Sequence, residues 1–184
     1  MSTPAATGVA RYDIDPQHTA AMFKVRHLMI SNVKGEFTKV SGSVAFDPSN
    51  PEASSVDITI DATSINTREP DRDAHLKSPD FLDVAKFPAI TFRSRKVKAS
   101  GKDEYDVIGD LTIHGVTREV TLAVDSVTPE AKDPWGFVRR GASASTTIQR
   151  KDFGLHWNMA LEAGGVVVGE DVHITIDAEF ARKA

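Results

Sequence analysis

The chain has 184 residues, 40 % hydrophobic and 26 % charged, a composition typical of a single globular domain. Its net charge of −4 at pH 7 argues against nucleic-acid binding, because neutralising several phosphates requires a concentrated Lys/Arg surface. The sequence contains no cysteine, which excludes disulfides, thiolate metal sites and cysteine nucleophiles.

The first eight residues contain Ser, Thr, Pro and Ala, without the basic start and apolar stretch of a secretory signal. A cytoplasmic location is therefore the default expectation. No apolar run approaches the roughly 20 residues of a membrane-spanning helix, so no transmembrane segment is expected. Residues 1–10 are expected to be flexible, and residues 1–184 to form a single domain.

An alternation of apolar and polar residues dominates the chain and predicts about eight β-strands. In one clear example, one face of the strand carries Val56, Ile58, Ile60 and Ala62, and the polar residues between them lie on the other. The same period of two recurs in residues 21–25, 40–46, 90–92, 107–113, 120–124, 142–148 and 172–180. Between Phe37 and Val40 the apolar phase slips by one residue, which predicts a β-bulge near Lys39.

One stretch breaks the alternation and predicts a short helix around residues 69–77. Pro70 stands near its start, and Asp73 and Lys77 have the spacing of an i, i+4 ion pair. Ser78, which precedes a proline, predicts one further helical turn.

These elements indicate an all-β protein. Turn-forming residues occupy 47–51, 100–103, 114–117 and 133–136, so consecutive strands are expected to be antiparallel neighbours. Regular strands that are polar on one side suit closure into an eight-stranded antiparallel β-barrel, which removes exposed edges. A two-sheet sandwich is the alternative architecture.

The sequence from Thr67-Arg68 through Arg72–Val84 resembles the signature of the YceI family of polyisoprenoid-binding proteins. The resemblance extends from about Tyr12 to Phe180. Other segments that match, in order, are Asp15-Pro16 with His18, Phe23, Val25 and His27, then Phe87-Pro88, Gly109–Thr117, Arg150 and Asp152–Leu155. The resemblance implies a lipocalin-like barrel with a long apolar interior that encloses a polyisoprenoid. Members of this family are often periplasmic.

The inward faces of the strands, taken with this resemblance, predict a ligand cavity. Its predicted lining is Phe23, Val25, Phe37, Phe46, Ile58, Ile60, Ala62, Ile90, Phe92, Leu111, Ile113, Leu122, Ala142, Ala144, Ile148, Ile174 and Ile176. Small side chains among larger ones are compatible with unfilled space. The alternative is that the alanines face a tightly packed wall or point outward, and some of the larger residues are expected to pack the barrel ends.

A group of basic residues on and beside the predicted helix could meet a diphosphate or quinone head group. These residues are Arg68, Arg72, His75 and Lys77. The alternative is a structural role for Arg72 and a solvated face for the others. A polyisoprenoid or quinone-type lipid is the expected partner and no other cofactor is expected, while a homodimer is left open.

The predicted function is binding, storage or transport of a long-chain apolar lipid. The alternative is an enzyme with Asp73 and His75 as an acid/base pair acting on an isoprenoid or fatty-acyl substrate. The six histidines fall in no metal-binding spacing, so no metal is expected. A third hypothesis is an interaction module with exposed Trp135, Phe153 and Trp157, although these residues are expected instead to plug the barrel ends.

Overall fold

The computed structural model describes residues 8–162 and 164–184. Of the segment predicted to be flexible, residues 1–7 lie outside the described residues, and Ala10 already begins the first strand.

The strands are β1 (Ala10–Ile14), β2 (Ala20–His27), β3 (Ser31–Phe37), β4 (Val40–Phe46), β5 (Ser55–Asp61), β6 (Ile65–Asn66), β7 (Ala89–Gly101), β8 (Glu104–Ile113), β9 (Val116–Asp125), β10 (Ala131–Lys132), β11 (Phe137–Gln149) and β12 (Val168–Lys183). The helical elements are α1 (Pro70–Lys77) and short 3₁₀ helices at Pro51–Ala53, Ala62–Ser64 and Arg150–Phe153. Each segment with a predicted two-residue period forms a strand, except that Ala62 belongs to a 3₁₀ helix.

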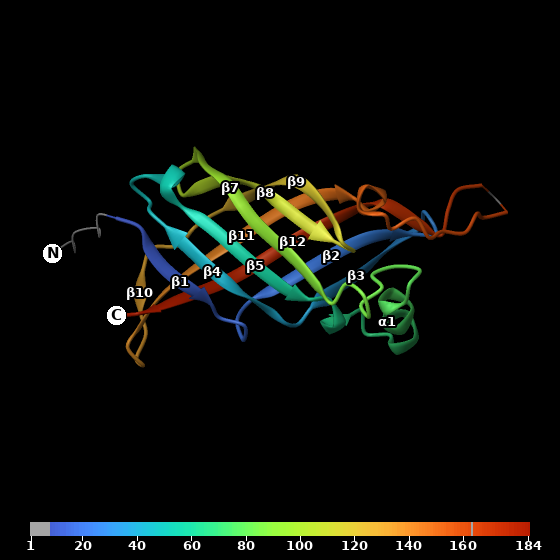
Figure 1. The fold of residues 1–184 in the computed structure, drawn as a ribbon, viewed down its shortest axis with the longest axis horizontal. Coiled ribbons are helices and arrows are strands. Elements are labelled where there is room, and N and C mark those ends of the chain that lie inside the picture. Colours follow the sequence, from blue (N-terminus) through green and yellow to red (C-terminus); the bar gives the residue numbers. More distant parts are fainter. Residues whose placement is uncertain (1–7, 163) are drawn as a thin grey trace.

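The sheet closes on itself because β11 pairs with β9 on one side and with β12 along its whole length on the other. β12 is long enough to pair with both β1 and β2, which follow one another along its far edge. Counting β1–β2 and β3–β4 as one interrupted strand each, the described residues form a closed antiparallel barrel of eight strands (Figure 1). The predicted fold class is confirmed, and the barrel replaces the alternative sandwich.

The wall is interrupted between β3 and β4, where the sequence predicts a bulge. The backbone N–H groups of Thr38 and Lys39 donate to the carbonyl and hydroxyl oxygens of Ser64, at 3.3 and 3.2 Å, instead of extending a strand ladder. Beyond this point β3 pairs with β2 and with the short β6, while β4 pairs with β5. The predicted phase slip therefore corresponds to a break between β3 and β4. The segment that contains α1 follows β6 in the chain.

The predicted helix is confirmed, and it starts at Pro70 with Glu69 as its N-cap. The Glu69 carboxylate accepts hydrogen bonds from the backbone N–H groups of Asp71 and Arg72, at 3.3 and 2.6 Å, which satisfies two of the free donors of the first turn. After Ser78 the chain forms hydrogen-bonded turns and not the further helical turn that was predicted.

Both termini lie at the end of the barrel opposite α1 (Figure 1). Aromatic side chains pack the interior at this end. Tyr12 packs edge-on against Phe180, and Phe46 against Tyr105, with 5.3 Å between ring centroids in each pair. The guanidinium of Arg140 lies 5.3 Å from the centroid of the Phe46 ring. Solid packing at this end leaves the α1 end as the place for a cavity.

Candidate functional site

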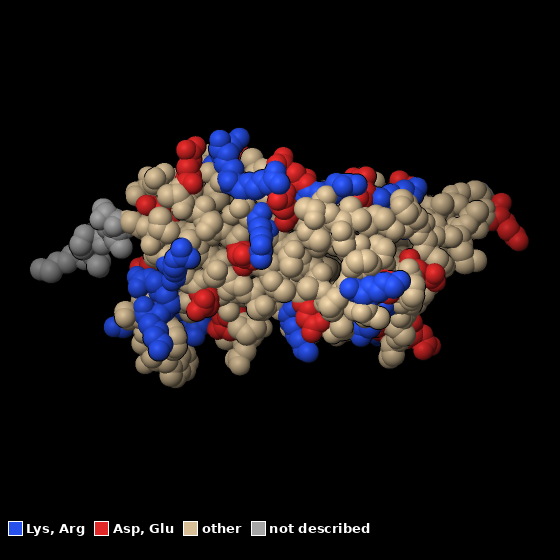
Figure 2. All heavy atoms as spheres, in the orientation of Figure 1, with Lys and Arg blue, Asp and Glu red and all other residues tan. Residues whose placement is uncertain are grey.

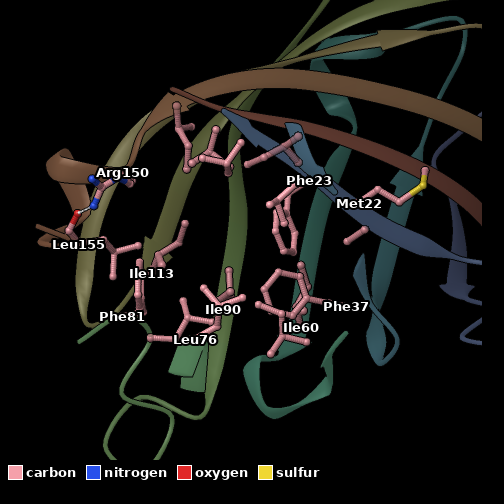
Figure 3. Close-up of a pocket in the computed structure, with 18 of the residues that line it drawn as sticks. Met22, Phe23, Phe37, Ile60, Leu76, Phe81, Ile90, Ile113, Arg150 and Leu155 are labelled. Atoms are coloured by element: carbon pink, nitrogen blue, oxygen red, sulfur yellow. Dashed lines mark hydrogen bonds between the residues drawn. The ribbon is translucent and has the colours of Figure 1, made fainter. Parts of the chain in front are cut away.

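An apolar cavity of about 340 Å³ occupies the half of the barrel nearest α1 (Figure 3). Its side walls are the inward faces of β2, β3, β5, β7, β8, β9, β11 and β12. Phe23, Phe37, Ile60 and Ile90 project into the same space from different strands, and Leu76 approaches them from α1 (Figure 3). The volume lies at the lower end of the range of small-molecule pockets, roughly 300–1,000 Å³.

Most of the predicted lining residues line this cavity. They are Phe23, Val25, Phe37, Ile58, Ile60, Ile90, Phe92, Leu111, Ile113, Leu122, Ile148, Ile174 and Ile176. Each faces inward because the period of two places every second side chain of a strand on the same face. Contact of these residues with a ligand stays a prediction.

Four predicted residues are not part of the cavity lining. Phe46 packs on Tyr105 at the filled end, and Ala62 is buried in the 3₁₀ helix after β5. Ala142 packs against the core and Ala144 is buried, both on the side of Thr146 that leads toward the filled end. The alanines therefore follow the alternative reading, in which small residues face a packed interior.

The sequence analysis missed the segments that cover the α1 end of the cavity. Leu76, Phe81 and Leu82 cover it from α1 and the following turns, and Leu155, Trp157 and Val167 from the segment before β12. These segments have no strand periodicity, so their inward side chains could not be selected by pattern. The available signal was the apolar content of the Arg72–Val84 motif, which was used only for its charges.

Five residues of the cavity lining have cationic or imidazole side chains. Arg26, His27, Arg72, His75 and Arg150 belong to the lining, and Arg26 is exposed. Among the lining residues that the structure describes there is no Asp or Glu. Any charge in the wall is therefore positive, an arrangement that favours an anionic or electron-rich group at the mouth.

The residues predicted to contact a head group are divided by the structure. Arg72 and His75 line the cavity, whereas Arg68 and Lys77 do not. The Arg72 guanidinium donates to the hydroxyl and carbonyl oxygens of Thr67, at 2.8 and 2.9 Å. Arg72 thus has the structural contact that the sequence analysis gave as the alternative, and it also faces the cavity.

Arg150 is a buried cation, 3 % exposed, that the sequence analysis noted only as part of the family motif. Its guanidinium donates to the carbonyl oxygens of Leu155, Trp157, Val168 and Gly169 at 2.6–3.3 Å. Figure 3 shows Arg150 beside Leu155. Burial lowers the pKa of Arg150 below its ordinary value, partly offset by the charge of Glu170. Arg150 therefore ties the covering segment to the start of β12.

The acid/base pair of the enzyme hypothesis is not formed. One carboxylate oxygen of Asp73 accepts hydrogen bonds from the backbone N–H and the hydroxyl of Thr67, at 2.8 and 2.5 Å. The His75 ring instead contacts the carboxylate of Asp80, with 2.8 Å between Nε2 and Oδ2. Asp73 has a structural role, and no observation favours catalysis by this pair.

Three aromatic residues that were predicted to plug the barrel ends, Trp135, Phe153 and Trp157, lie in different surroundings. Phe153 is buried in the hydrophobic core, so it is not an exposed interaction residue. Trp157 is half-buried and lines the cavity, and its ring packs against His75 and Phe81 with centroid distances of 4.8 and 5.2 Å. Trp135 is 78 % exposed in the turn before β11, so it does not plug an end.

A group of possible metal ligands exists elsewhere. Among the described residues, Asp15, His18 and Glu179 place one ligand atom each within 4.8 Å of one another. The Arg139 guanidinium donates to both carboxylates there, at 2.7 Å to Asp15, so these carboxylates already have a cationic partner from the protein itself. In the same described residues, no helix has the length and apolarity needed to cross a bilayer.

Comparison with known proteins identifies relatives of the whole barrel. A YceI-like domain matches residues 12–180. A UPF0312 protein of Vibrio cholerae is 39 % identical over 157 residues, which are 84 % of this chain and 82 % of that protein. BcnA of Burkholderia cenocepacia has a similar structure, with a TM-score of 0.79, 23 % identity and coverage of 90 % of this chain and 98 % of BcnA. A polyisoprenoid-binding domain of Saccharophagus degradans, implicated in plant cell wall breakdown, has a TM-score of 0.67 and 18 % identity, covering 92 % and 97 % of the two chains.

Proposed function

The chain belongs to the YceI family, and we propose that it binds the apolar chain of an isoprenoid-type lipid in the cavity at the α1 end of its barrel. The observation that carries this proposal is an apolar cavity whose wall contains Arg and His side chains and, among the described residues, no carboxylate. The name of the Saccharophagus degradans domain, which has the same fold, supports a polyisoprenoid as the ligand class.

Burial of the lipid's hydrocarbon chain in the cavity supplies the binding affinity. Each buried methylene contributes roughly 0.8 kcal/mol, so ten carbons contribute about 8 kcal/mol before the cost of ordering the ligand. An apolar chain requires no directional partner, and selectivity would follow from the length and shape of the cavity. Because the rings of Phe46 and Tyr105 fill the far half of the barrel, the end of the chain would stop before them.

Carriage of the lipid, as storage or transport, agrees better with this site than chemical conversion. Asp73 is engaged by Thr67, and His75 contacts Asp80 and not Asp73. The cavity wall then offers apolar surface and positive charge, and no acid/base pair of the kind the enzyme hypothesis requires.

Native mass spectrometry of the purified protein after incubation with a series of prenols tests this proposal. We expect a one-to-one complex with the wild type and its loss in Ile174→Trp, which places a larger side chain in the cavity. Thr175→Trp is the matched control, because Thr175 is the next residue of β12 and faces solvent. Equal binding by both variants would place the lipid outside the cavity.

We further propose that Arg72 and His75 receive the polar end of the ligand. Replacing Arg72 by Met should weaken binding of a prenyl diphosphate about tenfold or more, since a charge-assisted hydrogen bond contributes roughly 1.5–3 kcal/mol. Arg68→Met is the control, because Arg68 is exposed and does not line the cavity. Binding of the corresponding neutral prenol should be unchanged. Equal losses for both ligands would instead indicate damage to the Arg72–Thr67 contact.

A further inference from the structure

Three exposed apolar side chains lie at the α1 end of the barrel. Met29 and Ile30, in the turn between β2 and β3, are 52 % and 77 % exposed, and Met159, in the segment before β12, is 59 % exposed. These three residues are called the tip patch below. Large apolar side chains that are exposed together require an explanation, whereas a single one does not.

The two segments that carry the tip patch are held side by side. The backbone N–H of Leu28 donates to the Val167 carbonyl at 2.8 Å, and the N–H of Val167 donates to the Met159 carbonyl at 3.0 Å. The Met29 side chain also lies close to Gly165, since a Cβ built on that glycine would stand 3.3 Å from Met29 Cγ. The tip patch is therefore one surface made by two adjoining turns.

The tip patch adjoins the mouth of the cavity. Arg26 and His27, the last two residues of β2, line the cavity and are separated from Met29 only by Leu28. Val167 and Val168 line the cavity from the other segment. Both segments lie at the end of the barrel opposite the termini (Figure 1). On the face that Figure 2 shows, uncharged residues predominate over the segment before β12, apart from acidic atoms at the extreme tip.

Positive charge borders the tip patch along the outer face of β2 and β3. Lys24 and Lys34 are directly opposite one another across the two strands and both are exposed. Arg26 lies closer to the patch, and its guanidinium donates to the Met29 carbonyl at 3.0 Å. Within the part of the chain that the structure describes, none of these three cations is within 4.0 Å of a carboxylate.

We propose that the tip patch and these three cations dock the protein on an anionic phospholipid bilayer, with the mouth of the cavity facing the membrane. Apolar side chains would enter the interface while Lys and Arg contact anionic head groups, the combination that interfacial membrane binding uses. A protein partner fits less well, because lysines are depleted in protein interfaces and three side chains make a small contact. The inference rests on the proposed function, since a bilayer-soluble ligand must enter from and return to a membrane.

Co-sedimentation of the protein with vesicles tests the docking surface. We expect binding to phosphatidylcholine vesicles that contain phosphatidylglycerol and little binding to phosphatidylcholine alone. Ile30→Asp should reduce the bound fraction about tenfold, because one buried apolar side chain is exchanged for a charge. The double variant Lys24→Glu, Lys34→Glu should remove the preference for anionic vesicles. Glu162→Gln, which removes a negative charge from the neighbouring loop, should strengthen binding.

Trp135→Asp is the matched control, because Trp135 is also highly exposed but lies in the β10–β11 turn, at the opposite end. It should sediment with vesicles as the wild type does. Ile30→Asp should still form the one-to-one prenol complex in solution, so failure of docking is distinguishable from failure of the proposed function. Absence of vesicle binding, an equal loss in Trp135→Asp, or self-association through Ile30 without vesicles would overturn the proposal.

Discussion

At the residue scale, the space inside the cavity depends on a glycine. Gly35 in β3 is the cross-strand neighbour of Phe23 in β2, and a Cβ at Gly35 would stand 2.5 Å from the ring atom Cζ of Phe23. The Phe23 ring therefore lies over the glycine backbone, and its packing against Phe37, with 5.8 Å between centroids, forms one side of the cavity. The period of two predicts that Phe23 faces inward, but it does not show where the ring comes to rest.

Gly35→Ala should push the Phe23 ring into the cavity and weaken lipid binding while the protein stays folded. The added methyl group meets the far end of the Phe23 side chain, which can rotate away, and the methyl group of Thr67 at 2.8 Å, which must shift slightly. Gly42→Ala is the contrasting variant, because a Cβ there would meet the backbone oxygen of Asp57 at 2.1 Å and should cost more stability. Thermal unfolding and lipid titration of both variants check the prediction. Unchanged affinity in Gly35→Ala would show that Phe23 does not shape the binding space.

A second residue-scale prediction concerns pH. The hydrogen bond from Arg139, and then that from His18, lower the pKa of Asp15 from 3.8 to about 2. Because the folded-state pKa is depressed, the contribution of Asp15 to stability is complete above its ordinary pKa and is lost as the pH falls toward 2. Asp15→Asn should therefore lower the free energy of unfolding by about 1–2 kcal/mol near neutral pH. The loss should shrink as the pH falls from the ordinary pKa of Asp15 toward 2.

Urea unfolding of wild type and Asp15→Asn at several pH values measures this difference. Asp13→Asn serves as the control, since Asp13 is exposed on β1. A difference between wild type and Asp15→Asn that stays constant down to pH 2 would contradict the assigned ion pair.

At the scale of elements, eight of the described strands and α1 could be predicted from the sequence, whereas β1, β3, β6, β10 and the cover of the cavity were not. Alternation selects the inward face of each strand, and a proline after an N-cap marks the start of α1. Phe81, Trp157 and Val167 come from irregular segments that have no strand period. The position of the segment before β12 depends on contacts distant in sequence, such as the hydrogen bonds from Arg150 to the carbonyl oxygens of Val168 and Gly169, 18 and 19 residues away. The slip of the apolar phase between Phe37 and Val40 predicts an irregularity near Thr38. It does not identify Ser64, the residue 26 positions away to which Thr38 is hydrogen-bonded.

The junction between β6 and α1 depends on Thr67, which is buried and bonded to both Asp73 and Arg72. Thr67→Val keeps the shape of the side chain and removes its hydroxyl. The free energy of unfolding should fall by about 1–3 kcal/mol, because Asp73 and Arg72 each lose a hydrogen-bond partner. It should also speed hydrogen exchange in α1 and release of lipid. Thr63→Val, at an exposed position whose hydroxyl bonds Asp61, should have a smaller effect. Equal effects of the two variants on α1 exchange would contradict the role of this junction.

At the scale of the whole molecule, the barrel is asymmetric along its axis. Aromatic rings and arginines fill the half that carries the termini, and the half covered by α1 contains the cavity. The sequence predicts the barrel and most of the cavity wall, but it does not predict where the hollow ends, because inward residues of both halves have the same period. This asymmetry gives a bound chain a direction, with its apolar end inward and its polar end beside α1.

Photo-crosslinking with a prenyl diphosphate that carries a diazirine at its terminal isoprene unit tests that central claim most directly. Peptide mass spectrometry should place the crosslinks on the inner cavity residues, such as Ile58, Leu122 and Ile176, and competition with unlabelled prenol should remove them. Crosslinks on the outer surface, or near Arg72 and His75 at the mouth, would contradict a lipid held tail-inward in this cavity.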